Sequence, residues 1–175
     1  MNIQRAIAQI NQMQADGVIE RYAIGGAVGA TFHLEPVATL DVDVFVTFQP
    51  EAGNLLASPQ AIFDYLKARR GAMEGEYIVV AGWPVQFLPT ANPLVAEALA
   101  QAVERDVAGV AARVFTAEHL AAIALQTGRA KDKARLLQFI EAGSLDAARF
   151  QDIVSRHGLI EAWKRFEKQF LGGTP

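Results

Sequence analysis

The feature that most constrains this sequence is a pair of glycines followed by two closely spaced aspartates. Residues 22–48 contain, in order, a short apolar run, Gly25 and Gly26, a small-residue segment, and a second apolar run that opens with Asp41 and Asp43. Side chains two apart in a strand face the same side, so both carboxylates would project together while the valines beside them face the opposite side. Adjacent carboxylates repel each other, which is costly unless a cation neutralises them.

The glycine pair suits the close approach of a phosphate group. Residues 27–34 are mostly small and predict a helix that ends before Pro36, because the residue before a proline avoids the α region. Gly25 and Gly26 would let backbone N–H groups and the positive end of this helix hold phosphate. The alternatives are a plain tight turn for the glycines and a solvent-facing cap for the aspartates. We predict a phosphate-binding turn beside a divalent-metal site.

The rest of the pattern predicts an α/β (α+β) fold, a small mixed sheet packed with helices and followed by a helical C-terminal portion. Helices are predicted over residues 3–16, 27–34, 59–70, 93–103, 117–126, 131–142, 145–157 and 159–171. Strands are predicted over residues 18–24, 39–48, 77–81 and 85–88, with weaker candidates at 107–110 and 113–115, and a turn at 71–75. The first two strands are expected to be neighbours in a parallel or mixed sheet.

Composition limits the class of protein. Of 175 residues, 51% are hydrophobic and 20% charged, which suits a packed core and argues against disorder. The absence of cysteine excludes disulfides, cysteine zinc sites and cysteine nucleophiles. The N-terminal stretch is polar and amphipathic, and no apolar run approaches the roughly 20 residues that span a bilayer. We therefore expect a cytoplasmic protein that does not enter membranes.

The glycine pair opening a helix, with Asp41 and Asp43 on the following strand, resembles the signature of the nucleotidyltransferase superfamily with the DNA-polymerase-β-type palm. It resembles more closely the small bacterial proteins of this type that include the AbiEii toxins. The motif covers less than a fifth of the chain. The resemblance implies a palm over residues 1–115 with residues 116–175 packed on it as one compact unit.

The same resemblance implies an activity. Asp41 and Asp43 would be catalytic carboxylates that hold Mg²⁺ or Mn²⁺, and the substrate would be an NTP. The nucleotidyl group would pass to a hydroxyl of RNA, protein or a small molecule. A toxin role with an antitoxin partner, and a homodimer, are also open.

The superfamily pattern includes a third carboxylate on a strand beside the aspartate strand, and the matching position here is Gln86. Glutamine offers a carbonyl oxygen but neither charge nor the ability to accept a proton. Glu74 or Glu76 could take its place. The alternative function is therefore a catalytically impaired module that binds a nucleotide or a protein partner.

A basic motif lies at the start of the helix predicted from residue 131. Arg129 and Lys131 resemble the cations of the same small nucleotidyltransferase-like proteins and could bind phosphate. Asp132 would be favoured there by the helix dipole alone, and Lys133 and Arg135 are expected to be solvated. Residues 129–175 carry a net charge of +3 against −6 for residues 1–128, which suits either a polyanion or ordinary solvated helix faces.

Trp83 and the three histidines are expected to lie outside the candidate site chemistry. Trp83 could stack on a base, but packing is the expected role. His33, His119 and His157 have no metal-ligand spacing and are expected to be surface or satisfied core residues. Motifs typical of serine hydrolases and P-loop proteins are absent from the sequence.

Overall fold

The computed structural model describes residues 2–35, 39, 41–47, 60–69, 72–74 and 77–172, with the backbone alone for 72–74. The helices are α1 (Ile3–Ala15), α2 (Gly26–Ala30), α3 (Gln60–Ala68), α4 (Pro93–Ala100), α5 (Ala117–Thr127), α6 (Ala130–Glu141), α7 (Ala147–Arg156) and α8 (Ile160–Phe170). The strands are β1 (Arg21–Ile24), β2 (Val42–Thr47), β3 (Ala72–Glu74), β4 (Tyr77–Val80), β5 (Trp83–Pro89), β6 (Val103–Val107) and β7 (Val110–Val114). No helix in these ranges combines the length and apolar character needed to cross a bilayer.

The described strands form one mixed sheet in the order β3-β4-β5-β2-β1-β7-β6. Strand β2 pairs antiparallel with β1 and parallel with β5, and β1 pairs parallel with β7. The first two strands are therefore neighbours, as expected, but antiparallel. A parallel pair needs a long crossover, usually a helix, and the five-residue α2 is too short to carry the chain back along the sheet.

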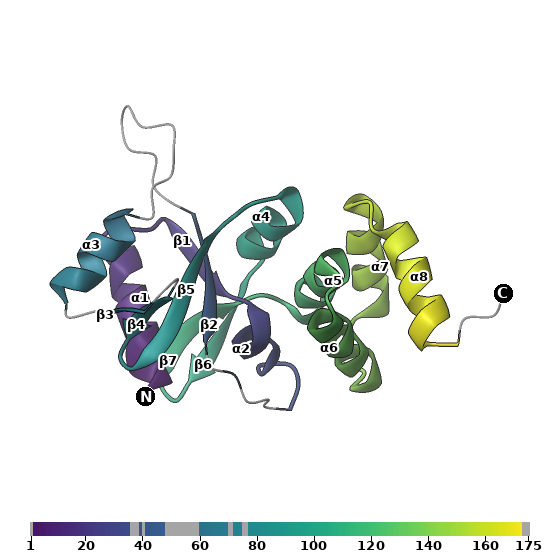
Figure 1. Ribbon diagram of the computed structural model, residues 1–175, viewed down its shortest axis with the longest axis horizontal. Coiled ribbons are helices and arrows are strands. Elements are labelled where there is room, and N and C mark those ends of the chain that lie inside the picture. Colours follow the sequence, from purple (N-terminus) through teal and green to yellow (C-terminus); the bar gives the residue numbers. More distant parts are fainter. Residues whose placement is uncertain are drawn as a thin grey trace.

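Two cores lie on opposite faces of the sheet. Helices α1 and α3 cover one face, whereas α2 and α4 lie on the other, with α5–α8 beyond them (Figure 1). Alternation along β2 buries Val42, Val44 and Val46 on the α1 side. It turns Asp43 and Phe45 toward the helical side, where Phe45 packs against the second core. The sheet face that carries the candidate site is thus fixed by burial of the valines.

Several predicted boundaries are wrong in informative ways. Residues 72–74 form strand β3 instead of a turn, and strand β1 begins at Arg21 instead of residue 18. The helix predicted over residues 93–103 counts the apolar Val103 as helical, but α4 ends at Ala100 and Val103 starts the β6–β7 hairpin. Ala108 and Gly109 form the turn of this hairpin with positive φ angles, a signal overlooked in the sequence.

Other predicted ends shift by a few residues. Helix α7 begins two residues later than predicted, because Asp146 caps it: its carboxylate accepts a hydrogen bond from the Arg149 N–H at 2.9 Å. Trp83 and Pro84 belong to β5, so the β4–β5 turn lies one step earlier than expected. Predictions for Pro36, for the loop at residues 49–58 and for the helix start at Pro59 lie outside the described residues.

Helix α5 begins at Ala117 as predicted and ends one residue later than predicted, at Thr127. The Thr116 hydroxyl accepts the His119 N–H at its start, and Gly128 ends it with a φ of +66°. A Cβ on Gly128 would meet only the Leu125 carbonyl oxygen at 3.8 Å, so the cost of a side chain there is conformational. We expect Gly128→Ala to lower the free energy of unfolding by about 1 kcal/mol. An unchanged urea midpoint would contradict the left-handed assignment.

Candidate functional site

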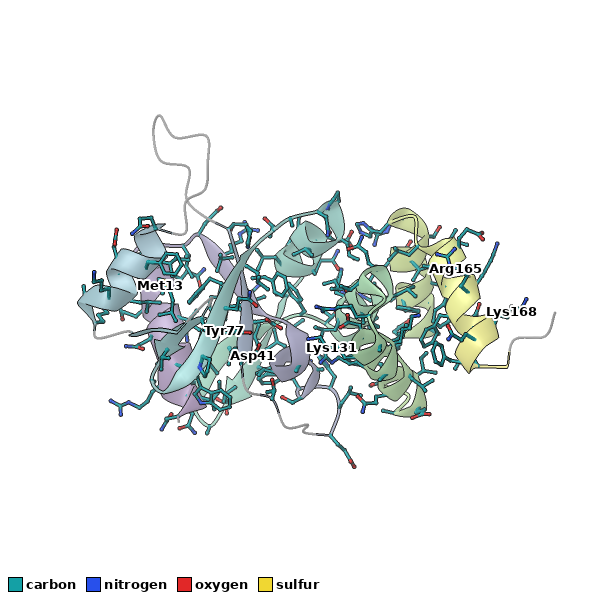
Figure 2. All side chains as sticks on the ribbon, in the orientation of Figure 1. Met13, Asp41, Tyr77, Lys131, Arg165 and Lys168 are labelled. Atoms are coloured by element: carbon teal, nitrogen blue, oxygen red, sulfur yellow. The ribbon has the colours of Figure 1, made fainter. Side chains whose placement is uncertain are left out.

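A cleft of about 1170 Å³ separates the sheet from the helical half of the molecule. One wall comes from α2, β2 and β5, and the other from α5, α6 and the start of α4. Asp41 and Lys131, from opposite walls, both lie in the central part of the molecule (Figure 2). The cleft thus brings together residues from the glycine–aspartate motif and the later basic motif.

Asp41 and Asp43 line the same cleft, although only Asp43 belongs to β2. Asp41 lies just before β2, and its carboxylate accepts a hydrogen bond from the Thr39 hydroxyl at 3.2 Å. Burial raises the pKa of Asp43, and the neighbouring Asp41 charge raises it further. Lys131 and Arg135 oppose this rise, so the second wall already supplies positive charge to the aspartates.

Gly26 touches the Asp43 carboxylate directly. Its φ is +57°, and a Cβ at this position would lie 1.8 Å from Asp43 Oδ2. At Gly25 a Cβ would lie 2.5 Å from the Phe45 ring, and the Gly25 N–H donates to the Asp43 carbonyl oxygen at 2.9 Å. Both glycines are therefore required for β2 to pack beside α2. Because α2 has only five residues, we expect the close backbone approach at these glycines to contribute more to phosphate binding than the helix dipole does.

Gln86 lies on the strand beside the aspartate strand, as expected. The parallel β2–β5 register pairs Asp43 with Gln86, and Gln86 also lines the cleft. The position beside Asp43 thus holds an amide in place of a carboxylate. Glu74 is in β3, separated from β2 by β4 and β5, and its side chain lies outside the described residues, as does all of Glu76.

The basic wall of the cleft comes from the first turns of α6. Arg129, at the N-cap of this helix, is tied to Asp132 by an ion pair, and Arg135 lies 4.0 Å from the same carboxylate. Asp132 is only 3% exposed, so it has a structural role in orienting both arginines. Arg135 was expected to be solvated, but its side chain is 20% exposed and lines the cleft. The spacing of four residues from Lys131 could have revealed it, since residues i and i+4 share a helix face.

The residues present fit a hard divalent cation. The two carboxylates that line this cleft are oxygen donors of the kind that Mg²⁺ and Mn²⁺ prefer. Within the described ranges, no group of three or more His, Cys, Asp or Glu side chains could hold a metal alone. Mg²⁺ is commonly held by one or two carboxylates together with substrate phosphates, which matches this arrangement.

Comparison with known proteins bears on the fold. The sequence matches no protein-family model and no curated protein. Among solved structures, an antigenic nucleotidyltransferase-like protein from Paracoccidioides brasiliensis superposes with a TM-score of 0.58 at 14% identity, over 93% of this chain and 92% of that one. The antibiotic-resistance factor ANT(2'')-Ia superposes in a solution structure with a TM-score of 0.52, at 14% identity and over 98% of each chain. Its crystal structure with adenylyl-2''-tobramycin gives 0.55, at 14% identity over 92% of this chain and 96% of that one. The fold is that of the nucleotidyltransferases.

Within the nucleotidyltransferase fold of this chain, a polar cluster that sequence reasoning missed fixes the helical wall of the cleft. Glu97 on α4 accepts hydrogen bonds from Arg156 at 2.6 and 2.9 Å, from His157 at 2.8 Å and from His119 at 3.2 Å. His119 is fully buried, and its other ring nitrogen contacts the Thr116 hydroxyl at 2.9 Å. The cluster joins α4 and α5, which both line the cleft, to the end of α7, which lies outside it.

This cluster makes stability sensitive to acid. The Arg156 guanidinium holds the pKa of Glu97 far below its usual 4.5, and burial lowers the pKa of His119 below 6.5. In both cases the unfolded chain binds protons first, so stability falls as the pH drops, through His119 below about 6.5 and through Glu97 below about 4.5. We expect urea midpoints to fall between pH 7 and pH 3, with a smaller fall below pH 4.5 in Glu97→Gln. An equal fall in that variant would contradict the role of Glu97.

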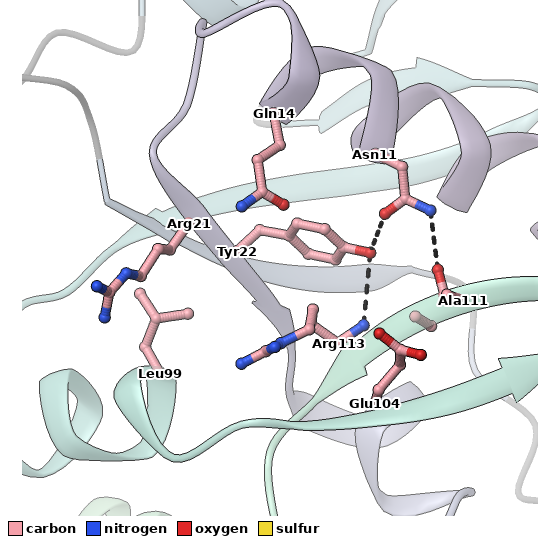
Figure 3. A pocket seen from close by; sticks show the side chains of 9 residues that line it. Asn11, Gln14, Arg21, Tyr22, Leu99, Glu104, Ala111 and Arg113 are labelled. Carbon is pink, nitrogen blue, oxygen red and sulfur yellow. Dashed lines mark hydrogen bonds between the residues drawn. The ribbon is translucent and has the colours of Figure 1, made fainter.

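The remaining sequence candidates have structural roles. Trp83 packs with the α1-side core and does not line the cleft, which confirms the packing interpretation. His33 contacts the Phe115 carbonyl oxygen at 2.9 Å, so it too is a satisfied residue. A second cavity of about 480 Å³ lies near α1 and β7, where the Tyr22 hydroxyl donates to Asn11 and accepts the Arg113 N–H (Figure 3). Several of its polar groups are already paired with each other.

Proposed function

We propose that the protein is a metal-dependent nucleotidyltransferase that binds an NTP with Mg²⁺ or Mn²⁺. The observation that carries this proposal is the placement of Asp41 and Asp43 across one cleft from Lys131 and Arg135. Acidic groups on one wall and basic groups on the other suit a metal-bound triphosphate, whose metal and phosphates need opposite charges. The nucleotidyltransferase fold supports the same proposal.

In the proposed reaction the acceptor oxygen bonds to the α-phosphorus, the bond from that phosphorus to pyrophosphate breaks, and the acceptor proton passes to water. Asp41 and Asp43 would hold the metal, which offsets the charge that develops on the phosphate oxygens. Arg129 and Arg135 would bind phosphate oxygens as planar forks, and Lys131 as a point charge.

The glycine pair and the acceptor complete the proposal. Gly25 and Gly26 would bring the backbone close to the phosphates beside Asp43. The acceptor would be a hydroxyl of RNA, of a protein or of a small molecule. A small molecule gains support from ANT(2'')-Ia, whose crystal structure contains adenylyl-2''-tobramycin.

The test is a calorimetric titration of the protein with each of the four NTPs, with and without Mg²⁺, followed by a pyrophosphate assay on the same samples with candidate acceptors. Metal-dependent binding together with pyrophosphate release is the expected result. Absence of binding for all four NTPs would contradict the proposal.

A second function, a nucleotide-binding module without turnover, is favoured by one observation. Gln86 lies beside Asp43 where a third carboxylate would assist the acceptor hydroxyl. This alternative predicts NTP binding without a transfer product in the wild type, and a product in Gln86→Asp or Gln86→Glu. A transfer product made by the wild type would exclude it.

The resemblance to AbiEii-type proteins adds a physiological hypothesis. The chain would then be a toxin held in check by an antitoxin encoded nearby. Growth arrest on expression, relieved by the neighbouring gene product, is the expected result. Unimpaired growth at high expression would count against it.

A further inference from the structure

The cleft contains a hydrogen-bonded amide pair that joins two helices of its helical wall, α4 and α5. Asn92, at the start of α4, donates from Nδ2 to Oε1 of Gln126 in the last turn of α5 at 3.1 Å. We propose that Gln126, oriented by Asn92, is a specificity-determining residue that donates hydrogen bonds to the base of the bound NTP. This inference rests on the proposed function and deepens it.

The orientation of the pair follows from helix capping. Asn92 is the N-cap of α4, and its Oδ1 accepts the Val95 N–H at 3.0 Å. A backbone N–H can only donate, so the cap fixes which end of the Asn92 amide is oxygen. The NH₂ group of Asn92 must then face Gln126, and the Gln126 Oε1 atom must accept its hydrogen bond. The Gln126 NH₂ group is left as the outward-facing donor.

This NH₂ group is available to a ligand. The described residues provide no hydrogen-bond partner for Gln126 Nε2, while the Gln126 side chain lines the cleft. The adjacent Thr127 hydroxyl donates back to the Ile123 carbonyl oxygen at 2.5 Å. Gln126 is therefore a side-chain donor at this end of α5, and a carbonyl oxygen or a ring nitrogen of a base could accept its hydrogen bonds.

The surroundings of Gln126 suit an uncharged ring. Val95, Leu120, Ile123 and Ala124 line the same part of the molecule, on α4 and α5. Among the described lining residues, charge is confined to the aspartates before and within β2 and to α6. Phosphates would therefore lie against α6, and the apolar α4–α5 wall is left for the base. All four bases carry acceptor atoms on their edges, so the amide can discriminate by which edge it meets.

Two variants test this role without removing a charge from the phosphate-binding wall. Gln126→Met keeps the length of the side chain but removes both donors. Asn92→Asp keeps the helix cap, yet a carboxylate can only accept, so Gln126 must turn its NH₂ group toward residue 92 and present its oxygen to the cleft. Gln138→Met, an exposed substitution on α6 outside the cleft, is the matched control.

The measurement is the dissociation constant of each of the four Mg²⁺–NTPs and of Mg²⁺–tripolyphosphate, by calorimetry. In Gln126→Met we expect the best-bound NTP to weaken by about three- to tenfold, the value of one or two neutral hydrogen bonds, with tripolyphosphate unchanged. In Asn92→Asp we expect the ratios among the NTPs to reorder, with bases that present an amino group gaining relative to the others. Gln138→Met should match the wild type, and thermal melting confirms that each variant is folded.

The outcomes separate this inference from the function on which it rests. Wild-type binding of NTPs with ratios that stay the same, within twofold, in both variants would overturn the role of Gln126 and leave the nucleotidyltransferase proposal standing. Equal weakening of the NTPs and of tripolyphosphate in Gln126→Met would also overturn it, because the residue would then act on the phosphates. Failure of the wild type to bind any NTP would overturn both.

Discussion

Replacing either aspartate of the cleft by alanine is expected to abolish Mg²⁺-dependent NTP binding while the fold survives. A carboxylate that holds a metal contributes several kcal/mol, so affinity should fall by at least about a hundredfold. Asp43→Ala should leave the melting temperature unchanged or raise it. The reason is that burial and Asp41 raise the pKa of Asp43, which means that its charge is held at a cost in the folded state.

The matched control for this pair is Asp64→Ala. Asp64 lies on α3, on the opposite face of the sheet, where its carboxylate accepts a hydrogen bond from the Gln60 side chain. It should bind NTP as the wild type does. Full Mg²⁺-dependent binding in either Asp41→Ala or Asp43→Ala would show that the metal assignment is wrong.

The second large effect is expected from Gly26→Ala. The new methyl group would lie 1.8 Å from Asp43 Oδ2, so the carboxylate or the turn must move. We expect NTP affinity to fall by at least about tenfold, because a displaced carboxylate no longer meets the metal in the right geometry. The free energy of unfolding should fall by more than the roughly 1–2 kcal/mol that a left-handed alanine costs.

Gly109→Ala separates the two causes in that prediction. Gly109 also has a positive φ, +88°, but a Cβ there meets nothing within 4 Å. This variant should therefore show the conformational cost without the loss of NTP binding. Equal effects of the two substitutions on binding would mean that Gly26 acts through backbone strain alone, and not through Asp43.

The parts of the site that local patterns control could be predicted from the sequence. The alternation along β2 predicted that Asp41 and Asp43 share a face, and the strand around Gln86 was placed beside them correctly. The same reasoning misjudged Val103, because an apolar residue at helical spacing fits a strand equally well. The turn at Ala108 and Gly109 distinguishes strand from helix here, because it marks the hairpin that begins at Val103.

Contacts between distant segments could not be predicted in this way. The Glu97 carboxylate meets Arg156 and His157 about sixty positions later, and no periodicity marks such a pair. The contact between Gly26 and the Asp43 carboxylate likewise depends on how α2 folds over β2. The division of the chain into residues 1–115 and 116–175 stays a prediction.

The parallel pairing of β2 with β5 has a consequence for the history of the protein. Register alone sets Gln86 beside Asp43, so the backbone geometry for a third carboxylate exists whichever side chain occupies the position. Glutamine and glutamate codons differ by a single base. Under the proposed function, a nucleotide-binding protein and a catalyst built on this sheet would therefore differ by one point mutation, and a lineage could cross between them in either direction without rebuilding the fold.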